Sequence, residues 1–477
     1  MMLVTQKRRK VVVVGGGITG LTAAFYMQKE ARAKELPLDI VLVESSLRLG
    51  GKIQTLKKDG FIIERGPESF FDRENHIHVL AQDLGIEQQI ITSNSGPTYV
   101  AVGSQLYPIP SSLMSGATPH ISSFITSGLF SLSGKIRAAG DFVLPKSAQD
   151  DDQPLGEFFR RRFGAEIVEN LVEPLLAGTF AGDIEQLSMH STFPQLYELE
   201  QKYRSLLIGM KKAGTNFLSN NRIAKDKGIF QTFENGLETL IEKIEESLLP
   251  GTVLKGVKVE GIEHGKDGTV QVVLNNFSQI KADAVILATP FNVTEKMFNK
   301  HQLLTELNSM KAATIATVTM AFKKEQIGDL DALSFFVSRN SDFSITSCTF
   351  SNRKWPSTTP TDYVLLRSYI GRVGDEAIVA LSDSEIEKTV LHDLRKTIGI
   401  DGTPVTTVVS RWKNAMPQYT VGHEAKIERV KRELSEHFPT VKLSGSSFEG
   451  ISIPECVEQG KKVASELLIE MFTQECM

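Results

Sequence analysis

Three glycines directly follow a short apolar run, and this arrangement could bind the phosphates of a dinucleotide. The run Val11–Val14 precedes Gly15-Gly16-Gly17-Ile18-Thr19-Gly20, which has the form GxGxxG. The first glycine allows a tight turn from strand to helix. The second lets backbone N–H groups approach a pyrophosphate, and the third lets the helix pack closely on the strand. The partial positive charge at the helix N-terminus favours phosphate here. We therefore predict a dinucleotide site at residues 15–20.

An acidic residue and a basic loop follow at the spacing that such a site needs. Glu44 ends the apolar run Asp39–Val43 and lies 24 residues after Gly20. A carboxylate at the end of the second strand accepts hydrogen bonds from a ribose. In the next loop, Arg48-Leu49-Gly50-Gly51-Lys52, paired glycines would let the backbone pass close to a diphosphate, and the two cations would offset its charge. The alternatives are a glycine turn without a ligand and, for Arg48 and Lys52, solvated loop charges.

The composition limits the classes to which the protein can belong. The chain has 477 residues, enough for two or three domains, and its net charge is −4. A nucleic-acid binder is excluded, because there is no excess of basic residues to neutralise phosphates. Cys348, Cys456 and Cys476 are odd in number and widely spaced, which predicts a reducing cytoplasm and neither a disulfide framework nor a metal site.

Apolar runs in the sequence are too short to cross a membrane. A transmembrane helix needs about 18 or more consecutive apolar residues, and the sequence contains no such run. We expect a cytoplasmic protein with at most peripheral membrane contact through residues 105–145, a stretch rich in Pro, Ser, Gly and apolar residues. The sequence specifies no oligomeric state.

Hydrophobic patterns predict a dinucleotide-binding domain interrupted by two insertions. Residues 155–176 place apolar side chains at helical spacing, whereas Ala284–Ala288 is a continuous apolar run typical of a buried parallel strand. The predicted fold class is α/β plus α+β. We expect a Rossmann-like domain assembled from three segments, residues 1–88, 228–292 and 440–477. A helical insert facing substrate or membrane is expected at residues 89–215, and a substrate-binding α+β domain at residues 293–439.

Several motifs resemble those of one enzyme superfamily. Residues 44–52 match the pattern E-x-x-x-R-x-G-G-[KR] of the flavin amine oxidases, which favours FAD over NAD as the ligand. Four further stretches resemble the oxygen-dependent coproporphyrinogen III and protoporphyrinogen oxidases of Gram-positive type: residues 64–70, 173–183, 411–423 and 445–454. The resemblance implies an FAD enzyme of heme biosynthesis. Covalently flavinylated amine oxidases have a cysteine a few residues after the glycine matching Gly445. This chain has Ser446-Ser447-Phe448-Glu449 there, so we expect noncovalent FAD.

The resemblance assigns parts of the flavin to residues by matched position. Gly15–Gly20 would hold the pyrophosphate, Glu44 the adenosine ribose, and the backbone of Val259 the adenine. Trp412 would pack at the isoalloxazine, and the helix starting at Pro454 would point its positive end at N1/O2. Ordinary core packing is the alternative for Trp412 and Val259. The predicted cofactor-binding residues are Gly15, Gly16, Gly17, Ile18, Thr19, Gly20, Glu44, Ser45, Arg48, Gly51, Lys52, Gly66, Pro67, Glu68, Ser69, Val259, Trp412, Ile451, Ser452 and Ile453.

The implied reaction is the oxidation of coproporphyrinogen III to coproporphyrin III by three hydride transfers to flavin, with O2 reduced to H2O2. Protoporphyrinogen IX as the main substrate, another flavin amine or carotenoid oxidoreductase, and a non-enzymatic flavoprotein or membrane-associated scaffold are the alternatives. Substrate carboxylates need cations, and Lys202, Arg204, Arg339 and Arg367 are candidates by location, with plain surface charges as the alternative. No residue is nominated as catalytic, and His423 is expected to be a structural hydrogen-bonding group.

Overall fold

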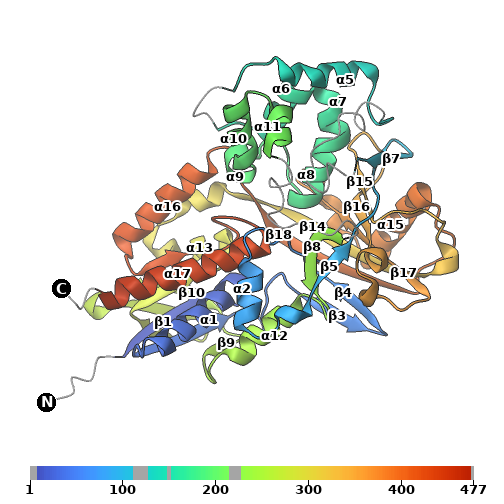
Figure 1. The fold of residues 1–477 in the computed structure, drawn as a ribbon. Coiled ribbons are helices and arrows are strands. Elements are labelled where there is room, and N and C mark those ends of the chain that lie inside the picture. The colour runs from blue at the N-terminus through green and yellow to red at the C-terminus, as the bar shows by residue number, and fades with distance from the viewer. Residues whose placement is uncertain (1–7, 111–126, 148–151, 214–226, 474–477) are drawn as a thin grey trace.

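A five-stranded parallel sheet forms one half of the molecule in the computed structural model, which describes residues 8–110, 127–147, 152–213 and 227–473. Helices α1 (Ile18–Ala33) and α17 (Ile453–Thr473) lie side by side against this sheet (Figure 1). In spatial order the strands are β19 (Val441–Leu443), β13 (Ala284–Leu287), β1 (Arg9–Val14), β2 (Leu38–Glu44) and β9 (Val253–Lys255).

The strand β1 is buried on both faces, which explains its continuous apolar run. Val11 and Val13 pack into a core with α1, α17, α2 (His76–Asp83) and α12 (Glu238–Ser247). Val12 and Val14 pack into a second core with the antiparallel strands β10 (Val259–His264), β11 (Val270–Leu274) and β12 (Gln279–Ala282). Because successive side chains of a strand point to opposite faces, a strand covered on both sides must be apolar throughout.

A seven-stranded sheet forms the other half. All of its strand pairs are antiparallel except β15 with β6, which is parallel. Helix α15 (Asp383–Ile398) packs on this sheet, and its N-terminus is fixed by a capping box between Ser382 and Glu385. In spatial order the strands are β18 (Thr406–Gln418), β14 (Lys311–Lys323), β17 (Tyr363–Ile370), β16 (Ile345–Phe350), β15 (Ser334–Val337), β6 (Thr98–Val102) and β7 (Gln105–Ile109).

A helical insert stands above the two sheets (Figure 1). Its interior holds a buried ion cluster in which Arg162 pairs with Asp141, at 3.3 Å, and with Glu200. Burial lowers the pKa of Arg162, while Asp141 opposes that effect. The elements of the insert are α5 (Leu132–Ala139), α6 (Leu155–Phe163), α7 (Ala165–Ile167), a π-helix at Val168–Val172, α8 (Glu173–Phe180), α9 (Met189–Thr192), α10 (Pro194–Tyr203) and α11 (Leu206–Ala213).

Smaller elements connect the two halves. The hairpin β3–β4 and the antiparallel pair β5–β8 join the parallel-sheet half to the seven-stranded sheet. Helices α13 and α16 pack on the second core of the parallel sheet. These elements are β3 (Thr55–Lys58), β4 (Phe61–Glu64), β5 (Ile90–Asn94), β8 (Lys227–Phe233), α13 (Phe291–Lys296), α14 (Ser351–Lys354) and α16 (His423–His437).

The expected fold class is confirmed, but two domain boundaries differ from the prediction. Strands β6 and β7 fall within the predicted helical insert, yet β6 pairs with β15 and both belong to the seven-stranded sheet. Helix α16 falls within the predicted substrate domain, yet Ile427, Val430 and Leu434 pack in the parallel-sheet core. Both differences arise from contacts between segments that are distant in the sequence.

The region predicted to contact a membrane is only partly described. Of residues 105–145, the stretch 111–126 lies outside the described residues. In the described part, Leu132, Ile136 and Val143 are exposed apolar side chains on or just after α5. None of the helices among the described residues combines the length and the apolar character that crossing a membrane requires.

Candidate functional site

The glycine turn after β1 is built by two glycines that the fold requires and one that leaves open space. Gly15 has φ +106°, and a Cβ atom there would lie 2.8 Å from the carbonyl oxygen of Ala288. A Cβ at Gly20 would lie 2.0 Å from the carbonyl oxygen of Gly15. A Cβ at Gly17 would meet no described atom within 4 Å. Gly17 therefore borders a space that a ligand can fill, at the N-terminus of α1.

Glu44 is the last residue of β2, and its carboxylate binds the backbone of the glycine turn. One oxygen accepts a hydrogen bond from Gly16 N at 2.7 Å, and the other accepts one from Ser46 N, also at 2.7 Å. The hydroxyl of Ser45 donates to the same Glu44 carboxylate at 3.2 Å. Both oxygens thus bind the protein's own backbone: Oε1 accepts two hydrogen bonds, whereas Oε2 accepts one and has lone-pair capacity left. Ribose binding by Glu44 stays a prediction.

The second glycine loop lies against the first. Gly50 N donates to Gly16 O at 2.8 Å, and a Cβ at Gly51 would lie 3.3 Å from Gly17 Cα. Arg48 donates to the carbonyl oxygens of Leu49 and Ile53, at 2.9 and 3.0 Å, and to that of Gly51. The guanidinium that was expected to offset diphosphate charge therefore also holds its own loop in shape.

Lys52 is a half-buried cation at the junction of this loop with the C-terminal segment. Its ammonium lies 3.3 Å from Ser446 Oγ, and burial lowers the pKa of Lys52. The hydroxyl of Tyr419 donates to Ser446 O at 2.9 Å. Ser452 caps α17 through a capping box with Glu455, and Gly460 lets that helix approach α1, because a Cβ there would lie 2.5 Å from Thr19 O.

The segment from Arg65 to Ser69 joins the two halves of the molecule. A Cβ at Gly66 would lie 1.8 Å from Lys52 O and 3.4 Å from Cζ2 of Trp412. The indole N–H of Trp412, on β18, donates to Arg65 O at 2.8 Å, and the hydroxyl of Thr317, on β14, donates to the same oxygen at 2.9 Å. The structure therefore brings Lys52, Gly66 and Trp412 together, as the predicted flavin site requires.

The other predicted cofactor residues lie at four places in the fold. Val259 is buried at the start of β10, and Val257, two residues earlier, donates its N–H to Glu44 O at 3.0 Å. Ile451 is half-buried, Ser452 is exposed, and Ile453 is buried at the start of α17. Ile18 and Thr19 are buried in the first turn of α1, and Pro67 and Ser69 are half-buried beside Gly66.

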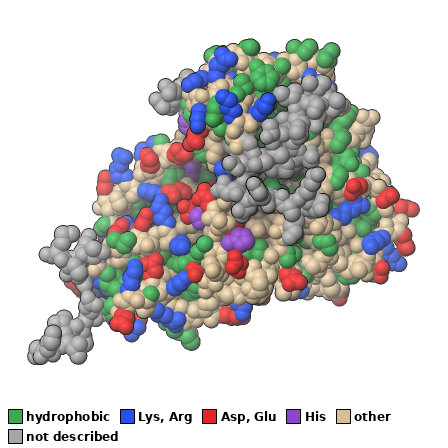
Figure 2. Space-filling model, in the orientation of Figure 1, with side chains coloured by type: hydrophobic (Ala, Val, Ile, Leu, Met, Phe, Trp, Pro, Cys, Tyr) green, Lys and Arg blue, Asp and Glu red, His purple; other side chains and the backbone are tan. Residues whose placement is uncertain are grey.

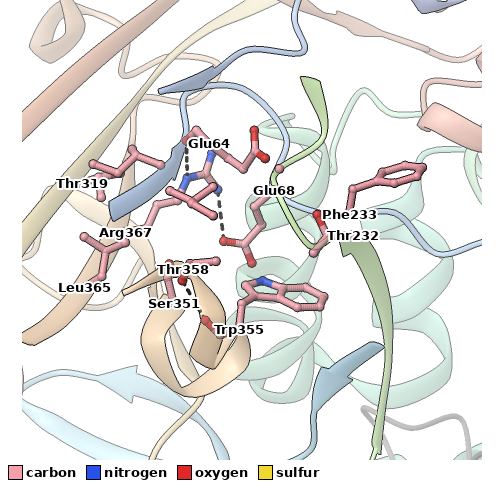
Figure 3. Close-up of a pocket in the computed structure, with 13 residues that line it drawn as sticks. Glu64, Glu68, Thr232, Phe233, Thr319, Ser351, Trp355, Thr358, Leu365 and Arg367 are labelled. Carbon is pink, nitrogen blue, oxygen red and sulfur yellow. Dashed lines mark hydrogen bonds and ion pairs between the residues drawn. The ribbon is translucent and has the colours of Figure 1, made fainter. Parts of the chain in front are cut away.

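A buried cluster of charged side chains, centred on Arg367 and Glu68, binds the backbone of the Gly66 segment. The Arg367 side chain is 2% exposed and donates to Glu64 O at 3.2 Å, to Gly66 O and to the Tyr369 hydroxyl. In Figure 3 the Glu68 carboxylate lies between Arg367, 3.6 Å away, and the indole of Trp355. Burial favours the neutral form of Glu68, but Lys354 and Arg367 outweigh it and hold the pKa of Glu68 below its usual value. Burial raises the pKa of Glu64 to about 7.

The cavity at this cluster is too small to be a substrate site. Its volume of about 20 Å³ has room for about one water molecule. Arg367 faces this space and binds backbone and side-chain groups of the protein itself. The predicted role of Arg367 in holding a substrate carboxylate is therefore wrong: its donors are committed to the Gly66 segment and to Tyr369. The spacing of Arg367 and Tyr369, two residues apart on one strand, could have indicated a shared face.

Two of the other predicted substrate cations make contacts only within the insert in the part of the chain that is described. Arg204 is exposed and donates to Phe142 O at 2.9 Å, and the ammonium of Lys202 lies 5.4 Å from the ring centre of Tyr203. Figure 2 shows Lys and Arg side chains scattered over this upper part of the molecule. Arg339, by contrast, pairs with Glu173 where the insert meets the seven-stranded sheet. A second cation there, Arg372, was not predicted from the sequence.

The parallel sheet, the open glycine turn and the carboxylate at the end of β2 are the features of a dinucleotide-binding protein. The family model of the flavin-containing amine oxidoreductases matches residues 18–468, and the chain belongs to this family. Its cofactor is therefore a flavin.

Three known proteins are similar over nearly the full length. The coproporphyrinogen III oxidase of Bacillus subtilis (strain 168) is 47% identical, with 98% of this chain and 99% of that protein covered. The coproporphyrinogen III oxidase of Staphylococcus aureus is 36% identical, with 97% and 100% covered. A crystal structure of an Exiguobacterium sp. 255-15 protein has a TM-score of 0.86 at 33% identity, with 97% and 99% covered. The predicted family and oxidoreductase class are confirmed.

Proposed function

We propose that this protein oxidises coproporphyrinogen III to coproporphyrin III in heme biosynthesis, using noncovalently bound FAD and O2. The observation that carries the proposal is the full-length similarity to two proteins named for this reaction. Protoporphyrinogen IX is the alternative substrate. A preference for the coproporphyrinogen is expected, because it has four propionates against two, and each well-placed charge-assisted contact contributes about 1.5–3 kcal/mol.

The described residues fit FAD at both ends of the cofactor. The open space at Gly17 and the N-terminus of α1 suit the pyrophosphate, and Glu44 has lone-pair capacity for the ribose. At the other end, Lys52 and the N-terminus of α17 would favour an anionic reduced ring, and such a ring would in turn favour the charged ammonium of Lys52, whose pKa burial lowers. Trp412, held through Arg65, would fix the ring plane. Bound flavin would accept two electrons in each of three rounds and pass them to O2, giving three H2O2 per porphyrin formed.

Noncovalent binding is supported by the residues around the predicted attachment position. Ser446 and Ser447 stand there, and Ser447 Oγ accepts a hydrogen bond from Phe291 N at 3.0 Å. The two described cysteines, Cys348 and Cys456, are buried, and burial raises the pKa of each thiol. His423, next to this segment, lies 3.0 Å from Phe448 O through Nε2, and burial lowers its pKa to about 4. A neutral, stacked imidazole suits a structural role.

Anaerobic titration with each porphyrinogen tests the proposal. We expect coproporphyrinogen III to bleach the flavin absorbance completely and air to restore it. Turnover in air should consume about three O2 and release about three H2O2 per coproporphyrin III, and acid precipitation should leave the flavin in the supernatant. The ratio of kcat/KM for the two porphyrinogens should exceed about tenfold, which corresponds to about 1.4 kcal/mol. Flavin that neither porphyrinogen bleaches would refute the proposed function.

A further inference from the structure

Two arginines share one buried carboxylate where the helical insert meets the seven-stranded sheet. Glu173 is the first residue of α8 and is 5% exposed. Arg339 follows β15 and forms an ion pair with Glu173 Oε1, while Arg372 follows β17 and lies 4.0 Å from the same oxygen. The other oxygen, Oε2, is buried and has no hydrogen-bond partner among the described residues. Two guanidiniums thus lie beside one carboxylate oxygen, and the other oxygen of that carboxylate makes no hydrogen bond among the described residues.

The charges of this cluster favour a second anion. Burial and the nearby Arg339 both lower the pKa of Arg372, whereas Glu173 and Asp375 raise it. Glu173 is the buried carboxylate of the group, and Asp375 is exposed. Partly buried guanidiniums of like charge are held together at a cost that an additional carboxylate would relieve, and Arg binds carboxylates with directed, charge-assisted hydrogen bonds. The Arg339 side chain is 41% exposed, so a ligand can reach the cluster.

Hydrogen bonds between the helical insert and the segment after β15 hold the cluster in place. Ser338 donates its hydroxyl to Glu169 O at 3.0 Å, and Asn340 lies 3.4 Å from side-chain oxygens of Glu169 and Asn170. Glu169 and Asn170 belong to the π-helix that precedes α8. Single π-helical turns within longer helices are frequent at functional sites. These hydrogen bonds therefore fix the backbone next to Arg339 relative to the helix that carries Glu173.

A series of hydrogen bonds connects this cluster to the predicted flavin end of the site. At the C-terminal end of α8, Ala181 O accepts a hydrogen bond from Val373, the residue after Arg372, at 3.1 Å. Phe180 O accepts one from the Gln418 side chain, also at 3.1 Å. Tyr419, next in the chain, binds Ser446 O, and Ser446 Oγ contacts Lys52. Helix α8, with eight residues and a length of about 12 Å, connects the two ends of this chain of contacts.

We propose that Arg339 and Arg372 form a subsite for a carboxylate of the substrate, with Glu173 as a positioning residue that holds both guanidiniums when the subsite is empty. The ligand class is a propionate side chain of a porphyrinogen, so the proposal rests on the proposed function. The subsite accounts for the part of the affinity that depends on substrate charge. Because such a contact is made before and during reaction, its loss raises KM and leaves kcat nearly unchanged.

The test compares two substitutions with a matched control in the flavin-loaded enzyme. Arg372→Gln should weaken binding of the product coproporphyrin III, followed by fluorescence titration, about tenfold. Arg339→Gln should weaken it less, because this side chain is more exposed and water screens its charge. Arg160→Gln is the control: it also removes an arginine of the insert from an ion pair, with Glu185, and its side chain is 38% exposed. We expect no change there.

The outcomes separate this proposal from the proposed function. KM for coproporphyrinogen III should rise with the dissociation constant, and Arg372→Lys should recover part of the loss by restoring the charge. Flavin content and melting temperature show whether each variant is folded, and Arg339→Gln at the exposed edge still tests the subsite if Arg372→Gln does not fold. Wild-type binding by both glutamine variants in an enzyme that oxidises porphyrinogens would overturn the subsite alone. An enzyme that oxidises no porphyrinogen would overturn the proposed function instead.

Discussion

Replacing Gly17 by alanine should separate the needs of the cofactor from the needs of the fold. The backbone at Gly17 has φ −73° and ψ 175°, an extended conformation that alanine adopts without strain. The added methyl would meet no described protein atom within 4 Å. A Gly→Ala change at a compatible position stabilises a protein by about 0.4–1 kcal/mol, because the unfolded chain loses freedom. The flavin-free Gly17→Ala protein should therefore be as stable as the wild type or slightly more stable.

The same methyl should interfere with FAD. It would occupy the space that we assign to the pyrophosphate, so the phosphate would lose its close approach to the backbone N–H groups at the start of α1. We expect FAD affinity to fall by at least about tenfold, or about 1.4 kcal/mol. Flavin fluorescence quenching on titration into the flavin-free protein measures the affinity, and denaturant unfolding of the same preparation measures stability.

Gly20→Ala is the contrasting variant. Its methyl would lie 2.0 Å from Gly15 O, so helix α1 must move away from β1. Forced overpacking of this kind costs about 1–3 kcal/mol. We expect this variant to lose stability even without flavin. A Gly17→Ala protein that binds FAD as tightly as the wild type would refute a pyrophosphate over Gly17.

Three further changes have expected outcomes. Glu44→Gln replaces one acceptor oxygen facing Gly16 N or Ser46 N by a donor, and should cost about 1–3 kcal/mol of stability in unfolding experiments while weakening FAD binding; unchanged FAD affinity would mean that Glu44 serves only the turn. Arg162→Met removes the cation that pairs with the buried Asp141 and Glu200, and should lower the free energy of unfolding by about 3–5 kcal/mol; a loss below about 1 kcal/mol would contradict the importance of this cluster. His423 has a folded pKa of about 4, below its unfolded value, so its contribution to stability is present above about pH 6.5 and is lost as the pH falls towards 4; His423→Gln should show a smaller loss of stability over that range, and equal losses would argue against a buried neutral imidazole.

Local sequence signals predicted the strand, the glycine turn and the position of Glu44, while cofactor binding by these residues stays a prediction. The glycine turn, the strand ends and Glu44 lie within one stretch of about 40 residues, where each signal constrains its neighbours. The second glycine loop is also local, and it contacts the first through Gly50 and Gly16. The glycines carried the most information, because backbone approach at Gly15 and Gly20 excludes a side chain.

Contacts between distant segments could not be predicted in the same way. Strand β6 joins the seven-stranded sheet through a parallel pair with β15, more than 230 residues later. Arg367 was predicted to hold a substrate carboxylate, because its charge alone did not reveal that Glu64 O, Gly66 O and Tyr369 surround it. Arg339 was predicted without its partners Glu173 and Arg372, because three separate elements bring these residues together.

The order of strands in the parallel sheet also sets a timetable for assembly. Strand β19 and helix α17, which complete the sheet beside β13 and cover α1, are synthesised after the other four strands of this sheet. A chain emerging from the ribosome carries the glycine turn well before the Ser446 loop and the positive end of α17, which follow it in the sequence. Pairing of distant segments is slow, and domains tend to fold as units. We therefore expect a flavin site that is complete only after β19 and α17 have joined the rest of the sheet.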